Sequence, residues 1–133
     1  MKYKPYLLKD VYAGEALNKF RVISTFAGGG GSSTGYRLAG GKILAINEFV
    51  EEARNTYRDN YPNTPILDGD IKELEGKDFL DITKLKEGEL ELLDGSPPCS
   101  AFSMCGTLAR EGTVHSDGFG KTKSYSDGKI VTN

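Results

Sequence analysis

Phe20-Arg21-Val22-Ile23-Ser24-Thr25-Phe26-Ala27-Gly28-Gly29-Gly30-Gly31 is a strand-like run that leads directly into four glycines. Its first seven residues are mostly β-branched or aromatic, which favours a strand. Ser32 and Ser33 then offer N-caps for a short helix, which Gly40 and Gly41 end. Because nucleotide-binding α/β sheets are built from a strand, a glycine loop and a helix in this order, the stretch predicts that fold class.

Strands and helices continue to alternate after this unit. Residues 42–47 are mostly apolar, residues 49–61 carry an amphipathic helical stripe that Pro62 ends, and residues 64–67 are typical of a third strand. An irregular helix precedes a fourth apolar run at residues 90–93. Such alternation makes parallel βαβ units, so we predict a doubly wound, Rossmann-like sheet of about four strands in the order 3-2-1-4, with the fourth strand at an unpaired edge.

The composition limits the function classes. With 133 residues, 27% charged residues and a formal net charge of −2, the chain resembles a soluble globular domain and lacks the cationic excess that a chain-wide grip on nucleic acid needs. No run is apolar enough for a signal peptide or a membrane span, so we expect a cytoplasmic protein. We divide the chain into an N-terminal arm at 1–19, a partial α/β domain at 20–105 and a truncated, flexible Gly/Ser/Lys-rich loop at 106–133.

A second informative stretch is Asp94-Gly95-Ser96-Pro97-Pro98-Cys99-Ser100-Ala101-Phe102-Ser103. It follows the fourth apolar run, so its cysteine is expected at the carboxyl tip of a strand, where α/β sheets place their chemistry. The two prolines fix two φ angles and remove two backbone donors, which gives Cys99 a stiff support. Cys99 is then either a nucleophilic thiol or an ordinary small residue in a turn.

The cysteines do not predict a metal site. Cys99 and Cys105 match no zinc spacing, and the lone histidine, His115, offers no second pair of ligands. We interpret His115 as a solvated loop residue.

The glycine loop alone leaves its ligand open. Gly30 and Gly35 have the spacing of a P-loop, but the Lys and Ser/Thr that must follow are missing, so hydrolysis of a nucleoside triphosphate is not expected. Gly28 and Gly30 fit a dinucleotide fingerprint, with Ser33 in the third glycine position. Glu48, after the second strand, could bind a ribose or cap a helix, and Asp70 could bind an adenine amino group or cap a helix.

Four segments in unbroken order resemble the DNA cytosine-5 methyltransferases. They are Phe26-Ala27-Gly28 with Gly30-Gly31; Asn47-Glu48 with Thr56-Tyr57 and Asn60-Tyr61-Pro62; Gly69-Asp70-Ile71; and Asp94 to Ser103 with Gly106. Ser96-Pro97-Pro98 also resembles the turn of adenine-N6 and cytosine-N4 methyltransferases, but those enzymes need an aromatic residue at position 99 to stack the flipped base. A thiol there suits attack on carbon instead.

The resemblance implies S-adenosylmethionine as cofactor. It implies that Phe26, Ala27, Gly28 and Gly30 surround the methionine end. Glu48 would bind the ribose hydroxyls, Phe49 would lie against the adenine ring, and Asp70 with Ile71 would meet the adenine edge. Cys99, supported by Pro98, matches the catalytic nucleophile that adds to C6 of a cytosine flipped out of double-stranded DNA.

The resemblance is incomplete in ways that bear on activity. Thr25, Gly29 and Ser100 depart from the commoner residues, which adjusts the fit without removing a reacting group. The family's later Glu-Asn-Val and Gln-Arg-Arg segments, its target-recognition region and the closing helix of the cofactor domain are not in these 133 residues. We therefore expect the N-terminal part of a restriction-modification methyltransferase that needs a complementary chain, or else a non-catalytic cofactor-binding module or truncated remnant.

Overall fold

The structure, a computed structural model, describes residues 4–99, 115–116, 122–126 and 129–132. Contacts within the chain divide it into two compact units, Met1–Ser96 and Pro97–Asn133. The first unit holds a four-stranded sheet and the second a three-stranded one.

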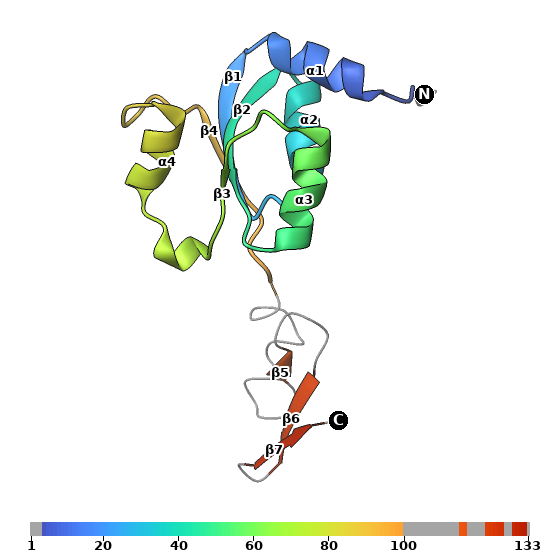
Figure 1. Ribbon diagram of the computed structural model, residues 1–133, viewed down its shortest axis with the longest axis vertical. Coiled ribbons are helices and arrows are strands. Elements are labelled where there is room, and N and C mark those ends of the chain that lie inside the picture. The colour runs from blue at the N-terminus through green and yellow to red at the C-terminus, as the bar shows by residue number, and fades with distance from the viewer. Residues whose placement is uncertain (1–3, 100–114, 117–121, 127–128, 133) are drawn as a thin grey trace. The chain divides into compact units, whose positions relative to one another are not determined.

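The first unit is an α/β fold. Its elements, in chain order, are α1 (Leu8–Ala16), β1 (Phe20–Thr25), α2 (Gly31–Leu38), β2 (Gly41–Asn47), α3 (Glu51–Asn60), β3 (Ile66–Leu67), the 3₁₀ helix η1 (Ile71–Glu73), α4 (Gly76–Thr83) and β4 (Leu92–Gly95). All four strands are parallel, in the order β3-β2-β1-β4. Helices α1, α2 and α3 lie on one side of the sheet and α4 on the other (Figure 1). The predicted fold class and strand order are confirmed.

The core follows the two central strands. Val22 in β1 and Ile46 in β2 are fully buried, as expected for parallel strands covered on both faces. Tyr57 of α3 and Tyr61, just after it, are also buried and join the same cluster. Burying each such side chain contributes about 1.5–3 kcal/mol, so this cluster holds α3 against the sheet.

The start of α2 differs from the prediction. Its N-cap is Gly30 rather than Ser32 or Ser33, and Ser33 is fully buried. Gly30 has a φ of +98°, and a Cβ on it would lie 3.0 Å from the Tyr57 ring. The helix begins early because glycine permits both this left-handed turn and the close approach of the aromatic ring.

Gly14 allows α1 to cross α2 closely. It lies inside α1, and a Cβ on it would come 2.2 Å from the Arg37 carbonyl oxygen of α2. A glycine inside a helical pattern usually indicates a break in the helix. Here it permits close packing against α2, which local periodicity cannot show.

Replacing Gly14 with alanine should destabilise the first unit. The added methyl group would force the two helices apart, which typically costs about 1–3 kcal/mol of unfolding free energy. Gly35→Ala in α2 is the matched control, because no atom of the described residues outside its chain neighbours and its own helix backbone lies within 4 Å of the added Cβ. That change should stabilise by about 0.5–1 kcal/mol through helix propensity. Urea denaturation followed by circular dichroism measures both, and equal stability of the two variants would contradict the crossing.

Strand β4 lies at an edge, as predicted, but two residues further along the chain than residues 90–93. In the described sheet it pairs with β1, and its Leu93 side chain is 69% exposed. Asp94 and Gly95 are therefore strand residues rather than part of the turn, and Ser96 alone separates the strand end from the Pro-Pro-Cys segment.

The second unit differs from the predicted loop. Its described residues form β5 (His115–Ser116), β6 (Thr122–Ser126) and β7 (Lys129–Thr132), an antiparallel sheet in the order β5-β6-β7. His115 thus belongs to a strand. Asp127-Gly128, between β-forming residues, is a hairpin signal that the interpretation as a loop overlooked. The predicted boundary at residue 105 lies outside the described residues, and the division at residues 19 and 105 stays a prediction.

Candidate functional site

The glycine loop leaves β1 through an unusual backbone turn. Phe26 has a φ of +53°, a left-handed conformation that costs a bulky residue free energy, and Gly28 follows with +57°. Buried Ala27 donates its N–H to the Asn47 carbonyl oxygen at 3.1 Å, which ties the loop to the end of β2. The Gly30 N–H then donates to the Ala27 carbonyl oxygen at 3.2 Å, so the loop is a closed turn.

Glu48 holds this loop from the neighbouring strand tip. It is only 7% exposed, and its Oε2 accepts a hydrogen bond from the Gly28 N–H at 2.8 Å. Its Oε1 accepts from the Val50 N–H at 2.9 Å. Each carboxylate oxygen has two lone pairs, so both retain capacity for one further donor.

Asn47 joins the same region to the third strand tip. Its Nδ2 donates to the carbonyl oxygens of Leu67 at 3.0 Å and Gly69 at 3.1 Å. The structure therefore brings the predicted residues after β1, β2 and β3 to one edge of the sheet.

The residues predicted to meet adenine lie at this edge, and their side chains are at least partly exposed. Phe49 is 53% exposed although it follows buried Glu48. Asp70 is exposed and caps η1, because its Oδ1 accepts from the Lys72 N–H at 3.0 Å, and half-buried Ile71 begins that helix. Of the two roles considered for Asp70, helix capping is present.

The carboxyl end of β4 is bonded to β1. Fully buried Ser24 donates its hydroxyl to Asp94 Oδ2 at 2.9 Å, and the Thr25 hydroxyl donates to the Asp94 carbonyl oxygen at 3.0 Å. Partial burial raises the pKa of the Tyr36 phenol, and the adjacent Asp94 carboxylate raises it further. These contacts fix the point from which the chain continues into Pro98 and Cys99.

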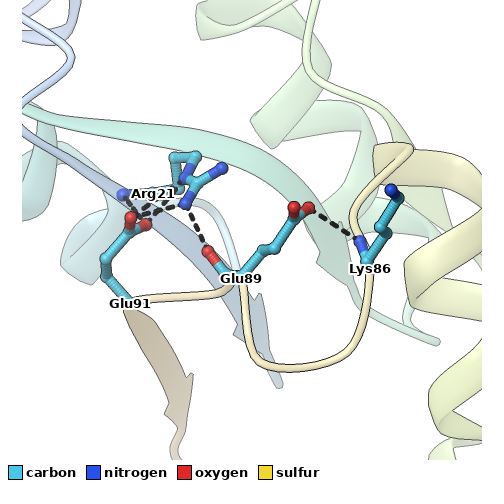
Figure 2. A network of polar contacts seen from close by, with 4 residues as sticks. All are labelled: Arg21, Lys86, Glu89 and Glu91. Atoms are coloured by element: carbon cyan, nitrogen blue, oxygen red, sulfur yellow. Dashed lines mark hydrogen bonds and ion pairs between the residues drawn. The ribbon is translucent and has the colours of Figure 1, made fainter.

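A second set of polar contacts holds the segment that leads into β4. The Arg21 guanidinium lies against the Glu91 carboxylate, with Nη2 to Oε1 at 2.6 Å and Nε to Oε2 at 2.8 Å, and also donates to the Glu89 carbonyl oxygen (Figure 2). The Lys86 N–H donates to the Glu89 carboxylate at 2.9 Å. The strand before the cysteine is thus attached to β1 by polar contacts at both ends.

These contacts predict an acid-sensitive attachment. Hydrogen bonding from Arg21 lowers the pKa of Glu91 from 4.5 to about 2. A carboxyl whose pKa falls on folding stabilises the protein above its unfolded pKa, and that contribution disappears as pH falls from about 4.5 toward 2. Denaturation midpoints of the natural chain and Glu91→Gln should differ at pH 6 and converge near pH 2. A constant difference across this range would contradict the prediction.

The two predicted catalytic residues, Pro98 and Cys99, are both exposed. They fall in the second unit, Pro97–Asn133, whereas all predicted cofactor residues fall in the first. Ser100 and Cys105 lie outside the described residues.

The cofactor implied by the resemblance fits the residues at the strand tips. Apart from the chain neighbours, no atom of the described residues lies within 4 Å of where a Cβ would stand on Gly28 or Gly69, so both backbones face open space. Phe49 offers an exposed aromatic surface, and Glu48 offers unused lone pairs. A ribose and an adenine could be bound by these groups.

Sequence reasoning missed two polar groups that organise this edge. The sequence pattern assigns no role to Asn47 within its motif and places Ser24 only in a strand. A polar residue near the end of an apolar strand is the signal that could have identified both, because a buried polar side chain requires a hydrogen-bond partner.

The described residues contain neither a cluster of metal ligands nor a membrane-spanning helix. No three His, Cys, Asp or Glu side chains in this part of the chain gather as metal ligands. No helix there is long and apolar enough to span a membrane.

Comparison with known proteins agrees with the resemblance. Type II methyltransferase M.AquIA of Picosynechococcus sp. is 36% identical over 86 residues, 65% of this chain and 35% of that protein. M.NgoPII of Neisseria gonorrhoeae is 34% identical over 91 residues, 68% of this chain and 25% of that protein. M.DdeI of Desulfomicrobium norvegicum is 37% identical over 86 residues, 64% of this chain and 20% of that protein. The chain thus spans only a fifth to about a third of these relatives.

The family model described as C-5 cytosine-specific DNA methylase matches residues 20–122, which include the glycine loop, Glu48, Asp70 and the Pro-Cys turn. Since this match covers most of the sequence, the chain belongs to the C-5 cytosine-specific DNA methylase family.

Proposed function

We propose that this chain is the N-terminal portion of an enzyme that transfers a methyl group from S-adenosylmethionine to C5 of cytosine in double-stranded DNA. Enzymes of this family generally use that cofactor and act on DNA. The observation that carries the proposal is the continuous family match from the glycine loop through Cys99. The hydrogen bonds among the three strand tips support it, because they hold the three loops at one edge of the sheet.

The cofactor is bound along this edge. Phe26, Ala27, Gly28 and Gly30 surround its amino-acid end, Glu48 accepts from the ribose hydroxyls, and the Phe49 ring lies against adenine. Asp70 and Ile71 meet the adenine edge. When bound, S-adenosylmethionine supplies a methyl group on a positively charged sulfur. The Gly28 and Val50 N–H groups keep the Glu48 carboxylate oriented for the ribose.

Cys99 performs the covalent step, with Pro98 stiffening its backbone. Its thiolate adds to C6 of a flipped cytosine, which makes C5 electron-rich enough to accept the methyl group. Loss of the C5 proton then restores the ring double bond and expels the cysteine.

The part of the enzyme that reads DNA and holds the cytosine lies outside these 133 residues, in the same polypeptide or in a complementary one. The relatives are about three to five times longer than the region they share with this chain. The exposed Leu93 on edge strand β4 gives such a polypeptide an apolar surface to cover. We expect the isolated chain to associate or to be poorly soluble, and a monodisperse monomer in analytical ultracentrifugation would count against this.

The experiment combines the chain with the complementary region of a longer relative, S-adenosylmethionine and DNA. If the cytosine carries fluorine at C5, no proton can be lost and the cysteine stays attached, so a DNA-linked chain should appear on a denaturing gel and mass spectrometry should locate DNA on Cys99. Methylation of ordinary DNA without any such adduct would sink the covalent mechanism.

The alternative is a non-catalytic cofactor-binding module, because every residue assigned to the cofactor lies in the first unit whereas Cys99 lies in the second. Calorimetry of the isolated chain with S-adenosylmethionine, followed by the reconstitution, separates the two. Binding without methylation in any combination supports the module, and absence of binding by a folded chain counts against both.

A further inference from the structure

Asn47 lies where the three strand-tip loops of the first unit meet. It is only 2% exposed, and its Nδ2 is bonded to the carbonyl oxygens of Leu67 and Gly69 at 3.0 and 3.1 Å. Its own carbonyl oxygen accepts from the Ala27 N–H at 3.1 Å. One residue therefore connects the end of β2 to the loops that follow β1 and β3.

The chemistry of the partners fixes the orientation of the Asn47 amide. Both neighbours are carbonyl oxygens, which only accept hydrogen bonds, so the NH₂ group must face them. Both of its protons are then used. The Asn47 NH₂ group is the donor to the Gly69 carbonyl oxygen, and no other side chain of the described residues donates to that oxygen. Removing the NH₂ group would therefore leave the carbonyl without a side-chain donor.

Gly69 is the residue at which the loop after β3 turns. Its φ is +107°, and Asp70 follows immediately and caps η1. Fixing the Gly69 carbonyl therefore fixes where Asp70 and Ile71 begin. Glu48 performs the corresponding task for the other loop through the Gly28 N–H, so the two adjacent residues hold different loops.

We infer that Asn47 is a positioning residue for the adenosine end of the cofactor: it holds the Gly69–Asp70 turn so that Asp70 and Ile71 meet the adenine edge. This inference rests on the proposed function for the site, but the attachment of the turn is a property of the chain itself and is measurable without any ligand.

Hydrogen exchange of the isolated chain tests that attachment. In Asn47→Ala, the amides of residues 72–74 should exchange at least about tenfold faster than in the natural chain. These amides are bonded to Asp70 and Ile71, and the turn before them has lost two hydrogen bonds. Helix α4 should be unchanged. Ser24→Ala is the matched control, because it removes a buried hydrogen bond to Asp94 on the other side of β1. If Asn47→Ala does not fold, Asn47→Ser, which keeps one donor, is measured instead. Unchanged exchange at residues 72–74 overturns the inference.

A double-mutant cycle tests whether Asn47 acts through Asp70. Calorimetry with S-adenosylmethionine should give about tenfold weaker binding for Asn47→Ala and for Asp70→Ala. The double variant should bind within about twofold of Asp70→Ala alone, because the turn no longer has an adenine contact to position. Additive losses, which a general destabilisation would produce, overturn the inference, as does unchanged binding by Asp70→Ala. If the natural chain binds no cofactor, the proposed function fails, and the exchange experiment alone decides whether Asn47 holds the turn.

Discussion

A Cys99→Ser chain, combined with the complementary region of a longer relative, is expected to transfer no measurable methyl group to DNA. A serine hydroxyl is far less acidic than a thiol and a weaker nucleophile toward carbon, so the attack on C6 should nearly cease. Removing a covalent nucleophile typically lowers the rate by about 10³-fold or more. Transfer of radiolabelled methyl groups from S-adenosylmethionine to DNA measures the effect.

Two controls separate lost chemistry from lost structure. Cys105→Ser changes the other cysteine of the chain and should retain methylation. The Cys99→Ser chain itself should bind S-adenosylmethionine as tightly as the natural chain, because every residue assigned to the cofactor lies in the first unit. Full methylation by the Cys99→Ser enzyme would refute the assignment of the nucleophile.

The parallel sheet could be predicted from sequence because its signals are local. The apolar runs of β1 and β2, the glycines between strand and helix, and Pro62 after α3 each depend on a few neighbouring residues. The order β3-β2-β1-β4 then follows from the way in which βαβ units are wound. The predicted fourth strand, residues 90–93, ends two residues before β4 does, because Asp94 has low strand propensity. The hydrogen bonds of Asp94 with Ser24 and Thr25 override that propensity.

The candidate site could be predicted only in its residue types. The tips of parallel strands meet at one edge, which is why Glu48 and Asp70 could be placed near the glycine loop. Glu48 accepts from the Gly28 N–H, and Asn47 donates to the Gly69 carbonyl oxygen. Both bonds depend on side-chain directions across strands. Local periodicity carries no such information.

Arg37 is the clearest case that sequence reasoning missed. Its position behind the glycine loop predicts no role for it, yet its side chain is fully buried. Its Nη1 donates to the Tyr57 hydroxyl at 3.1 Å and its Nη2 to the Thr64 hydroxyl at 2.7 Å. Its Nε lies 3.1 Å from the Glu15 carboxylate, and its guanidinium carbon lies 3.7 Å from the centre of the Tyr61 ring. These partners come from separate segments, so no local pattern could reveal them.

Arg37→Met is expected to lower the unfolding free energy of the first unit by about 3–5 kcal/mol, the usual cost of removing one partner from a buried ionic network. A small domain has only about 5–15 kcal/mol in total, so much of the variant should unfold or aggregate at 37 °C. The matched control is Arg58→Met, because Arg58 is exposed on α3 and bonds only Asn55 among the described residues, at 3.3 Å. That change should cost less than about 0.5 kcal/mol.

The Glu15 side chain indicates which part of this loss is largest. It is 21% exposed and also lies 3.3 Å from the Ile43 N–H, so water and this donor compensate its carboxylate once Arg37 is gone. The Tyr57 hydroxyl belongs to a fully buried residue, so water does not reach it. The same burial raises the pKa of the Tyr57 phenol. Tyr57→Phe should therefore recover part of the stability lost in Arg37→Met, whereas Glu15→Gln should recover little. Urea denaturation of the two double variants measures this, and the opposite order would show that the ion pair with Glu15, rather than the hydrogen bond to Tyr57, makes Arg37 necessary.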